Sequence, residues 1–302
     1  MPLVDSYGRR ISYLRLSVTG RCNLRCVYCR PAAGKCAAGP DEQLDYDGLL
    51  RVAEAAVSLG VEKIRITGGE PLLRPGITGF ISDLAGLAGL EQLVLTTNGQ
   101  FLAELADGLK QAGLQRINIS MDSLDVATYA AITRGGELRR VIEGLAAAEQ
   151  AGFGSVKINV VVMRGVNDHE LLDFAALSLE HPWDVRFIEL MPTRAGVAAT
   201  AVSGTEIMAK LSECYRLQPV AGGRLDGPSR SFRITGAAGT VSLITPLFNH
   251  FCHTCNRLRL TSDGLLKGCL FGTDALDIKP YLHTDDVRGL EAAMLEAVRA
   301  KP

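Results

Sequence analysis

Two groups of three cysteines are the residues of this sequence whose spacing points most directly to chemistry. The first group, Cys22, Cys26 and Cys29, has C-x3-C-x2-C spacing in the segment RCNLRCVYC. Three thiolates in one loop can bind three irons of a cubane iron-sulfur cluster, which leaves the fourth iron open to a small chelating cofactor. A four-cysteine zinc site uses two C-x2-C pairs, and this loop has only one. The spacing therefore favours an iron-sulfur cluster with an open iron.

The second group, Cys252, Cys255 and Cys269, has C-x2-C-x13-C spacing. His250 and His253 lie beside its first pair and could complete a Cys3His zinc site. Zinc therefore competes here with a second iron-sulfur cluster, which would also have an open iron.

Alternating segments of strand and helix character must position these cysteines. Short β-branched and apolar runs predict strands, and the stretches between them have apolar residues at helical spacing. The predicted strands are residues 13–18, 62–67, 92–97, 115–120, 156–163 and 184–190. The predicted helices are residues 49–59, 101–112, 138–151 and 169–179. Repeated βα units imply parallel strands joined by right-handed crossovers.

Three of these helices are followed directly by Gly60, Gly113 and Gly152, where a left-handed residue would end each helix. Six βα units are fewer than the eight of a closed barrel, so they predict an open, doubly wound sheet or an incomplete barrel. Because the pattern weakens after residue 195, we divide the chain into a repeat domain, 1–195, and a smaller C-terminal module, 196–302. This module should contain a helix at 205–215, strands at 231–235, 240–244 and 257–261, and a final helix at 285–300.

Several predicted strands carry cationic and polar residues at every second position, although a buried parallel strand should be almost wholly apolar. The alternation puts each polar set on one face of its strand. The sets are Arg15 and Ser17; Lys63, Arg65 and Thr67; Arg116, Asn118 and Ser120; Lys157 and Asn159; and Arg186. An unpaired buried charge is costly, so such cations must pair with carboxylates or bind an anion. We expect Arg116 to be ion-paired, and Arg65 and Lys157 to face a ligand.

The overall charge of the 302-residue chain excludes several functions. Lys and Arg total 32 against 33 Asp and Glu, so neither nucleic acid nor an anionic membrane is an expected partner. The first ten residues lack the apolar core of a signal peptide, and no apolar run is long enough to span a bilayer. We therefore expect a cytoplasmic protein in which the two other cysteines, Cys36 and Cys214, are ordinary free thiols.

The first cysteine motif has Tyr28 before its last cysteine and is followed, after the second strand, by Gly68-Gly69-Glu70-Pro71. These two motifs on successive βα units resemble those of radical S-adenosylmethionine (SAM) enzymes. Further segments occur in order: RLSVTGRCNLRCVYCRP, KIRITGGEPLLR, LVLTTNG, RINISMDSL, KINVVVMRGVND, RFIELMP and FCHTCNRLRLTSDGLLKGCLF. Together, over residues 4–271, they resemble the GTP 3′,8-cyclase family of molybdenum cofactor biosynthesis.

This resemblance implies an α/β fold, an incomplete (βα)6 TIM-type barrel whose C-terminal module carries a second 4Fe-4S cluster. Cys22, Cys26 and Cys29 would hold the 4Fe-4S cluster that binds and cleaves SAM, and Cys252, Cys255 and Cys269 would hold the second, whose open iron receives guanine. The implied SAM contacts are Tyr28, Gly69, Ser120 and Met191. The implied GTP contacts are Arg15, Arg65, Thr96, Lys157, Arg257 and Arg259, with Lys63 and Arg186 as further expected contacts. Arg257 and Arg259 also join the first three cysteines in the implied catalytic set.

The implied reaction converts GTP to (8S)-3′,8-cyclo-7,8-dihydroguanosine 5′-triphosphate. A 5′-deoxyadenosyl radical removes hydrogen from the ribose 3′ carbon, and the sugar radical attacks C8 of guanine. The implied partners are the downstream cyclic pyranopterin monophosphate synthase and an electron donor such as flavodoxin or ferredoxin, and a homodimer is left open. Two alternatives stay open: a radical SAM enzyme with an auxiliary cluster that acts on a peptide or another small molecule, and a catalytically silent metal-binding homologue.

Three features depart from the family pattern. Its chains ordinarily end in a tail closing with Gly-Gly that assists catalysis, whereas this sequence ends at Lys301-Pro302. Arg30 stands where the family usually has Met, and residues 192–200 lack an expected Trp-containing segment. We therefore expect either a shortened chain or a protein without the assistance of that tail, with the cluster assignments unaffected.

Overall fold

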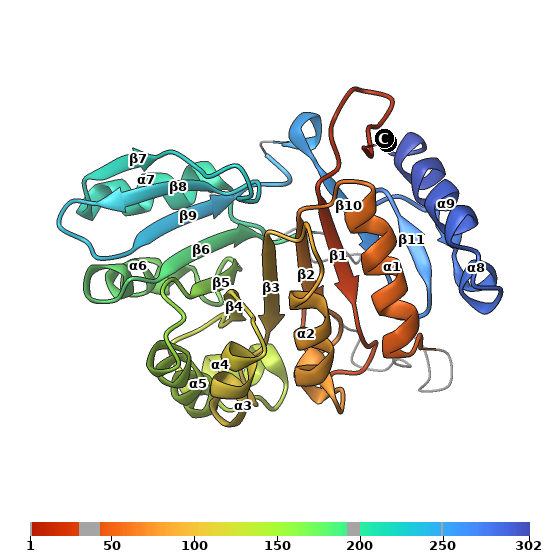
Figure 1. Ribbon diagram of the computed structural model, residues 1–302. Helices are drawn as coiled ribbons and strands as arrows, with labels where there is room; N and C mark the ends of the chain where they lie inside the picture. Colours follow the sequence, from red (N-terminus) through yellow and green to blue (C-terminus); the bar gives the residue numbers. More distant parts are fainter. Residues whose placement is uncertain (1, 30–42, 192–199, 249) are drawn as a thin grey trace.

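One twelve-stranded sheet organises the chain (Figure 1). The computed structural model describes residues 2–29, 43–191, 200–248 and 250–302. The strands are β1 (Tyr13–Ser17), β2 (Lys63–Thr67), β3 (Gln92–Thr97), β4 (Arg116–Ser120), β5 (Lys157–Val162), β6 (Asp184–Glu189), β7 (Leu217–Val220), β8 (Arg230–Ile234), β9 (Thr240–Ile244), β10 (Arg257–Leu260), β11 (Leu265–Lys267) and β12 (Leu276–Asp277). The α-helices are α1 (Tyr46–Ser58), α2 (Ile77–Ala85), α3 (Leu102–Gln111), α4 (Val126–Thr133), α5 (Leu138–Gln150), α6 (Leu171–Glu180), α7 (Gly204–Cys214), α8 (Lys279–His283) and α9 (Val287–Arg299).

The strand order is β12-β11-β10-β1-β2-β3-β4-β5-β6-β9-β8-β7. Strands β1 to β6 are adjacent and parallel, which confirms the predicted βα repeats. C-terminal strands extend both edges of this group, since β10 pairs in parallel with β1 and β9 pairs in parallel with β6. In the described part of the chain, β12 and β7 do not pair with each other, so the sheet is an incomplete barrel.

The C-terminal residues therefore do more than pack against the repeats, because their strands continue the same sheet on both sides. The predicted domain boundary at residue 195 lies within 192–199, outside the described residues. Arg30, Cys36 and most of the segment 192–200 lie outside them as well.

The repeat helices cover one side of the sheet. Neighbouring helices α1 and α2, α2 and α3, and α3 and α5 pack together, while α7 contacts α6 and α9 lies along α1 (Figure 1). Gly60, Gly113 and Gly152 have φ angles of 92°, 91° and 78°, which confirms the predicted left-handed helix ends. Among the described residues, none of the helices is long and apolar enough to cross a membrane.

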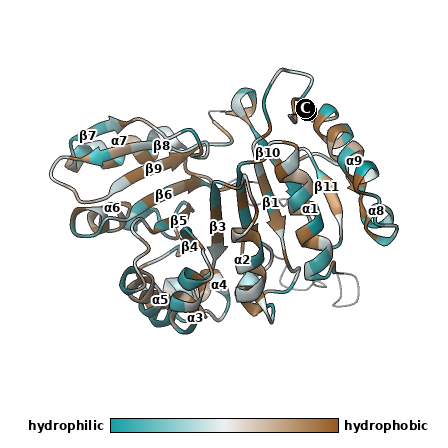
Figure 2. Cartoon of the chain, viewed as in Figure 1, coloured by the Kyte–Doolittle hydropathy of each residue, from teal (hydrophilic) through white to brown (hydrophobic). Residues whose placement is uncertain are grey.

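Alternate strand residues form the core under these helices. In β1 and β2, Leu14, Leu16, Ile64 and Ile66 are completely buried in one continuous hydrophobic cluster. Figure 2 shows hydrophobic and hydrophilic residues interspersed along the strands and helices. Because successive side chains point to opposite faces of a strand, the residues between these apolar ones line the inner side of the barrel. The sequence pattern therefore leaves a polar inner wall.

Candidate active site

The first cysteine group lies in the loop that follows β1, at the C-terminal edge of the parallel strands. Two backbone hydrogen bonds fix this loop on the end of α4: Arg25 N donates to Thr133 O at 3.1 Å, and Val27 N donates to Ile132 O at 2.9 Å. Cys29 N also donates to Cys26 O at 3.0 Å. The loop is therefore held by main-chain contacts at the edge where sites of this architecture form.

The three sulfurs of this group lie close enough to affect one another. Burial raises the pKa of the Cys26 thiol to about 12, and the negative charges of Asp122, Cys29 and Cys22 add to that effect. Neighbouring thiolates repel one another, and bound iron would remove this cost. The donor set thus fits the iron-sulfur cluster that its spacing predicts.

Tyr28 connects the cluster loop to the end of β4. Its hydroxyl donates to Oδ2 of Asp122 at 2.6 Å, and Val161 N donates to Oδ1 of the same carboxylate at 2.8 Å. Burial raises the pKa of Asp122 to about 6, although both hydrogen bonds favour its charged form. Asp122 was not among the predicted site residues, and its only signal in the sequence was a carboxylate two residues after the end of a predicted strand.

The Gly68-Gly69-Glu70-Pro71 segment runs beside the residues that precede Cys22. Gly69 N donates to Thr19 O at 2.6 Å, and Glu70 N donates to Arg21 O at 2.7 Å. A Cβ atom on Gly68 would lie 2.5 Å from Thr19 O, so only glycine permits this approach. The predicted SAM contact Gly69 is thereby placed next to the cluster loop.

Glu70 joins this segment to the end of β3. Its Oε1 accepts hydrogen bonds from Thr97 Oγ1 at 2.7 Å and Leu72 N at 3.0 Å, and its Oε2 accepts one from Asn98 N at 2.7 Å. Burial nevertheless raises the pKa of Glu70 to about 7. Asn98 in turn donates through Nδ2 to Asn23 Oδ1 at 2.9 Å. A chain of hydrogen bonds therefore links β2, β3 and the first cysteine group.

The other predicted SAM contacts lie at the same edge of the sheet. Ser120 is the last residue of β4 and is paired in register with Asn159 of β5. Met191 follows Leu190, which packs in a small hydrophobic cluster with Val27 and Tyr28 of the cysteine loop. Cys22, Cys26, Cys29, Tyr28, Gly69, Ser120 and Met191 thus come together at the C-terminal ends of the strands.

A row of three arginines crosses the middle of the inner wall. Arg15 of β1 is paired in register with Arg259 of β10 on one side and with Arg65 of β2 on the other. Adjacent strands are about 4.8 Å apart, so three guanidinium groups share a small space. Burial, together with repulsion from Arg15 and Arg257, lowers the pKa of Arg259 to about 9.

The surroundings of Arg65 indicate most clearly that this row of arginines favours a bound anion. Burial and its cationic neighbours lower the pKa of Arg65 to about 10, although Tyr13 acts in the opposite direction. The buried Nε atom of Arg65 has no hydrogen-bond partner among the residues that the structure describes. Thr96 Oγ1 and both amide atoms of Asn118, which are in register on β3 and β4, are buried and unpartnered in the same way. Such groups are costly unless a ligand or water satisfies them.

Carboxylates balance part of the positive charge nearer the N-terminal ends of the strands. Asp184 Oδ2 lies 3.0 Å from Lys157 Nζ and 2.7 Å from Arg186 Nε. Burial opposes ionisation of Asp184, but Arg186 and then Lys157 lower its pKa to about 2. Lys157 was expected to face a ligand without such a partner. It is ion-paired because Asp184 occupies the matching register position on β6. One carboxylate shared by two cations still leaves a net positive charge.

A loop from the C-terminal module closes this end of the barrel. We call residues 221–229, between β7 and β8, the floor loop. Lys63 Nζ donates to Leu225 O at 2.6 Å, and Arg224 forms ion pairs with Glu62 and Glu91 at the starts of β2 and β3. Arg116 Nη1 lies 3.3 Å from Asp226 Oδ1, which confirms the expected ion pair of Arg116.

Lys63 is the most perturbed cation beside the floor loop. Burial, and then repulsion from Arg65 and Arg116, lowers the pKa of Lys63 to about 7, while Asp226 opposes this shift. The same Asp226 carboxylate also acts on Lys157. Asp226 therefore places a negative charge among cations that strands β2, β4 and β5 supply.

The second cysteine group lies at the opposite end of the strands from the first. Cys255 precedes the start of β10, and β11 returns antiparallel to β10 so that Cys269, just after β11, comes back to the same end. A cavity of about 380 Å³ opens beside Cys269. Among residues 2–29, 43–191, 200–248 and 250–302, no three His, Cys, Asp or Glu side chains gather around a single metal position.

Arg257 contacts this second group directly. Its Nε and Nη2 atoms donate to Cys255 Sγ at 3.3 and 3.2 Å. Burial opposes ionisation of Cys255, but Arg257 and then Lys301 bring the pKa of its thiol down to about 7. Arg257 thus stands between the second cysteine group and the arginine row.

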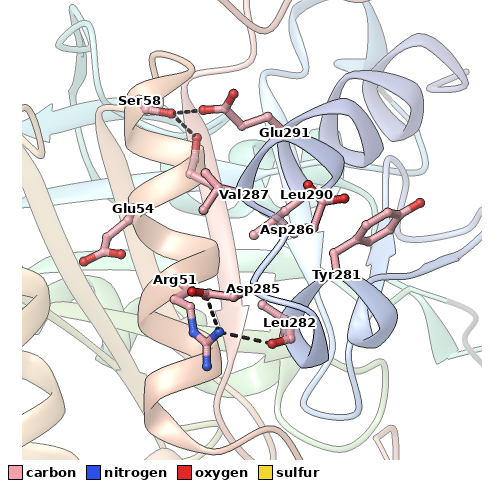
Figure 3. Close-up of a pocket in the computed structure, with 11 residues that line it drawn as sticks. Arg51, Glu54, Ser58, Tyr281, Leu282, Asp285, Asp286, Val287, Leu290 and Glu291 are labelled. Atoms are coloured by element: carbon pink, nitrogen blue, oxygen red, sulfur yellow. Dashed lines mark hydrogen bonds and ion pairs between the residues drawn. The ribbon is translucent and has the colours of Figure 1, made fainter.

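A smaller cavity of about 180 Å³ lies outside this site, between α1, α8 and α9 (Figure 3). Ser58 Oγ donates to Glu291 at 2.8 Å across it, and Arg51 Nη1 lies 2.7 Å from Asp285. These contacts attach the C-terminal helices to α1. The cavity contains neither cysteine group nor any residue of the arginine row.

Two family profiles together span most of the chain. The Radical SAM superfamily matches residues 16–177, and Molybdenum Cofactor Synthesis C matches residues 183–302. A GTP 3′,8-cyclase of Geobacter sulfurreducens is 55% identical over 304 residues, which cover 100% of this chain and 93% of that protein. A GTP 3′,8-cyclase of Moorella thermoacetica is 46% identical over 301 residues, which cover 99% of this chain and 93% of that protein.

Solved structures share the fold at low sequence identity. Streptococcus suis SuiB superposes with a TM-score of 0.65 and 13% identity, covering 94% of this chain and 67% of SuiB. The enzyme anSMEcpe with bound AdoMet has a TM-score of 0.52 and 16% identity, covering 67% of this chain and 59% of that one. The predicted fold class is thereby confirmed. With both profiles matched and more than half of its residues shared with a relative over its whole length, the chain belongs to the GTP 3′,8-cyclase family of radical SAM enzymes.

Proposed function

We propose that this chain converts GTP to (8S)-3′,8-cyclo-7,8-dihydroguanosine 5′-triphosphate, the first step of molybdenum cofactor biosynthesis. The observation that carries the proposal is the row of Arg259, Arg15 and Arg65, which lies along the strands between the two cysteine groups. A triphosphate would offset the repulsion in this row and accept a hydrogen bond from Nε of Arg65, which has no partner in the described part of the chain. The relatives named GTP 3′,8-cyclase supply the identity of the nucleotide.

Charge balance on the inner wall supports a polyanionic substrate. The cations are Arg15, Lys63, Arg65, Arg116, Lys157, Arg186, Arg257 and Arg259, and in the described part of the chain Asp184 and Asp226 form ion pairs with three of them. Burying such an excess of positive charge is unfavourable without a bound anion. The excess is local, because the whole chain has a net charge of only −1.

The residues present suit the two clusters and the SAM molecule that this reaction needs. Cys22, Cys26 and Cys29 would hold the first 4Fe-4S cluster, and Cys252, Cys255 and Cys269 the second. Tyr28, Gly69, Ser120 and Met191 would contact SAM. When bound, the first cluster and SAM supply the one-electron chemistry and the radical that removes hydrogen from the ribose 3′ carbon.

The chain's own side chains bind and orient GTP in this proposal. Arg15, Arg65 and Arg259 bind phosphate oxygens, and Thr96 adds a hydroxyl at the neighbouring strand. Lys157 contributes positive charge that Asp184 only partly neutralises, and Lys63 and Arg186 add to it. Arg257 and Arg259 orient the end of the nucleotide nearer the second cysteine group. The floor loop limits the access of water at the N-terminal ends of the strands. The bound nucleotide then holds its ribose in one position, facing the first cysteine group.

The remaining partners follow from the same reaction. Electrons would come from a flavodoxin or ferredoxin, and the product would pass to a cyclic pyranopterin monophosphate synthase. We place the reaction in the cytoplasm, where reducing conditions keep cluster-binding thiols available.

Anaerobic reconstitution tests the proposal. With iron, sulfide, SAM and dithionite, we expect about eight irons per chain, no zinc, and 5′-deoxyadenosine release that GTP stimulates and ATP does not. The cyclised nucleotide should form in step with 5′-deoxyadenosine. If both clusters assemble but GTP neither binds nor is consumed, the cyclase proposal is wrong.

A further inference from the structure

Lys301 is a buried lysine beside the second cysteine group. Only 4% of its surface is exposed. Its Nζ atom donates to Gly268 O at 2.7 Å, to Arg257 O at 3.3 Å and to Cys255 Sγ at 3.4 Å. Within the described residues none of these partners is a carboxylate, and a buried ammonium group requires a compensating negative charge. The sulfur of Cys255 is the partner that can supply this charge as a thiolate.

The hydrogen bonds to the three cysteines are unequal. Cys255 Sγ accepts from Lys301 and twice from Arg257. Among the residues that the structure describes, the sulfurs of Cys252 and Cys269 accept no comparable N–H group. The protein therefore concentrates positive charge on one of the three sulfurs.

Contacts around Lys301 connect the end of α9 to the segments of Cys269 and Cys252. Gly268, whose carbonyl accepts from Lys301, directly precedes Cys269, and a Cβ atom there would lie 3.1 Å from Cβ of Lys301. Arg9 donates through Nη2 to Pro302 O at 2.8 Å and through Nη1 to Cys252 O at 2.5 Å. These contacts fix the end of α9 against the cysteines, so the ammonium group has little freedom to turn away.

We propose that Lys301 is a positioning residue for the second iron-sulfur cluster. Its ammonium group donates a hydrogen bond to the Cys255 thiolate and raises the reduction potential of that cluster. This inference rests on the proposed second cluster. Hydrogen bonds and positive charge at a ligand sulfur stabilise the reduced form, because reduction adds negative charge to the cluster. Nothing in the sequence spacing of the cysteines indicates this role.

The experiment uses the full chain carrying C22A, C26A and C29A, so that only the second cluster contributes to the spectra. Lysine labelled with 15N at Nζ is incorporated, and the reduced cluster is examined by pulsed electron paramagnetic resonance. We expect a nitrogen coupling that disappears in K301M and in K301R, since neither retains a labelled nitrogen at this position. A redox titration should show a lower midpoint potential in K301M, near-wild-type potential in K301R, and no change in K279M, which alters a partly exposed lysine on α8.

Three outcomes would contradict the proposed role of Lys301. Full iron content with no 15N coupling in the otherwise native chain would overturn the role of Lys301, and this measurement does not depend on folding of a lysine variant. An unchanged potential in iron-loaded K301M would do the same. Failure of the C22A/C26A/C29A chain to bind about four irons would overturn the second cluster itself, and the role of Lys301 with it.

Discussion

The hydroxyl of Tyr28 lies 2.6 Å from Oδ2 of Asp122, so the cysteine loop is attached by one short hydrogen bond to a buried carboxylate at the end of β4. Oδ1 of Asp122 also accepts a hydrogen bond from Val161 N of β5. The position of the first cysteine group therefore depends on strands that follow it by about a hundred residues. Tyr28 and Asp122 therefore hold the cysteine loop in place, whereas Cys22, Cys26 and Cys29 would bind iron.

Replacing Tyr28 by Phe should lower the stability of the folded chain without removing the iron ligands. The variant leaves Oδ2 of the buried Asp122 without its donor, which costs about 1–3 kcal/mol in unfolding free energy. Chemical denaturation of the iron-loaded protein measures this difference. Y7F is the matched control, because Tyr7 is 70% exposed. Equal destabilisation by both variants, or none by Y28F, would show that the hydrogen bond does not hold the loop.

Replacing Arg65 by Met should weaken GTP binding while leaving the fold as stable as before. Loss of a charged hydrogen bond to phosphate costs about 1.5–3 kcal/mol, or about ten- to hundredfold in Kd. Stability should not fall, because the variant removes a buried cation that Arg15, Arg186 and Arg257 repel. Isothermal titration with GTP and thermal unfolding measure the two effects. R10M, at an exposed arginine, serves as the control. Unchanged GTP affinity in R65M would contradict the assignment.

GTP binding above neutral pH should be accompanied by proton uptake at Lys63. Burial and the facing cations Arg65, Arg116 and Arg186 lower its pKa to about 7, with Asp226 acting the other way, so most Lys63 side chains are neutral at about pH 8 in the free protein. Phosphate nearby favours the ammonium form and raises this pKa, so uptake should approach one proton at about pH 8 and vanish near pH 6.

Calorimetry in two buffers of different ionisation enthalpy measures this proton uptake. The K63M chain should show less uptake than the native chain at about pH 8, because its side chain cannot titrate. Equal uptake by both proteins would mean that Lys63 keeps its charge state when GTP binds.

Replacing Asp226 by Asn should strengthen GTP binding. Its carboxylate lies among Lys63, Arg116 and Lys157, where it competes with phosphate for the same cations. Because Asp226 is partly exposed, the gain should be modest, about three- to tenfold in Kd. D83N, on the exposed side of α2, should leave Kd unchanged. Weaker GTP binding in D226N would show that Asp226 supports the site.

The sequence predicted the barrel strands well and the shorter elements poorly. Strands β1 to β6 agree with the predicted ranges to within about one residue at each end, because their β-branched residues alternate with polar ones between clear helix ends. Helices α2 and α4 were not among the predicted helices; α4 gives no helical pattern because its sequence, VATYAAIT, is apolar without a polar face. Strands β7, β11 and β12 have two to four residues and depend on pairing with neighbours rather than on local pattern.

The residues of the candidate site were likewise predicted only in part. The cysteines and inward cations are visible in the sequence because their spacing is local. Their partners are not, since Asp226 lies 110 residues from Arg116 and Lys301 lies 46 residues from Cys255. Lys157 shows the consequence: its place on the inner wall was predicted, but its pairing with Asp184 required the register of β5 and β6.

The most direct test of the account uses GTP carrying deuterium at the ribose 3′ carbon. The fully reconstituted chain, with SAM and a reductant, should transfer that deuterium into 5′-deoxyadenosine while the cyclised nucleotide accumulates. Release of 5′-deoxyadenosine without deuterium, or with GTP unchanged, would contradict the claim that the inner cations hold the ribose of GTP in place for this reaction.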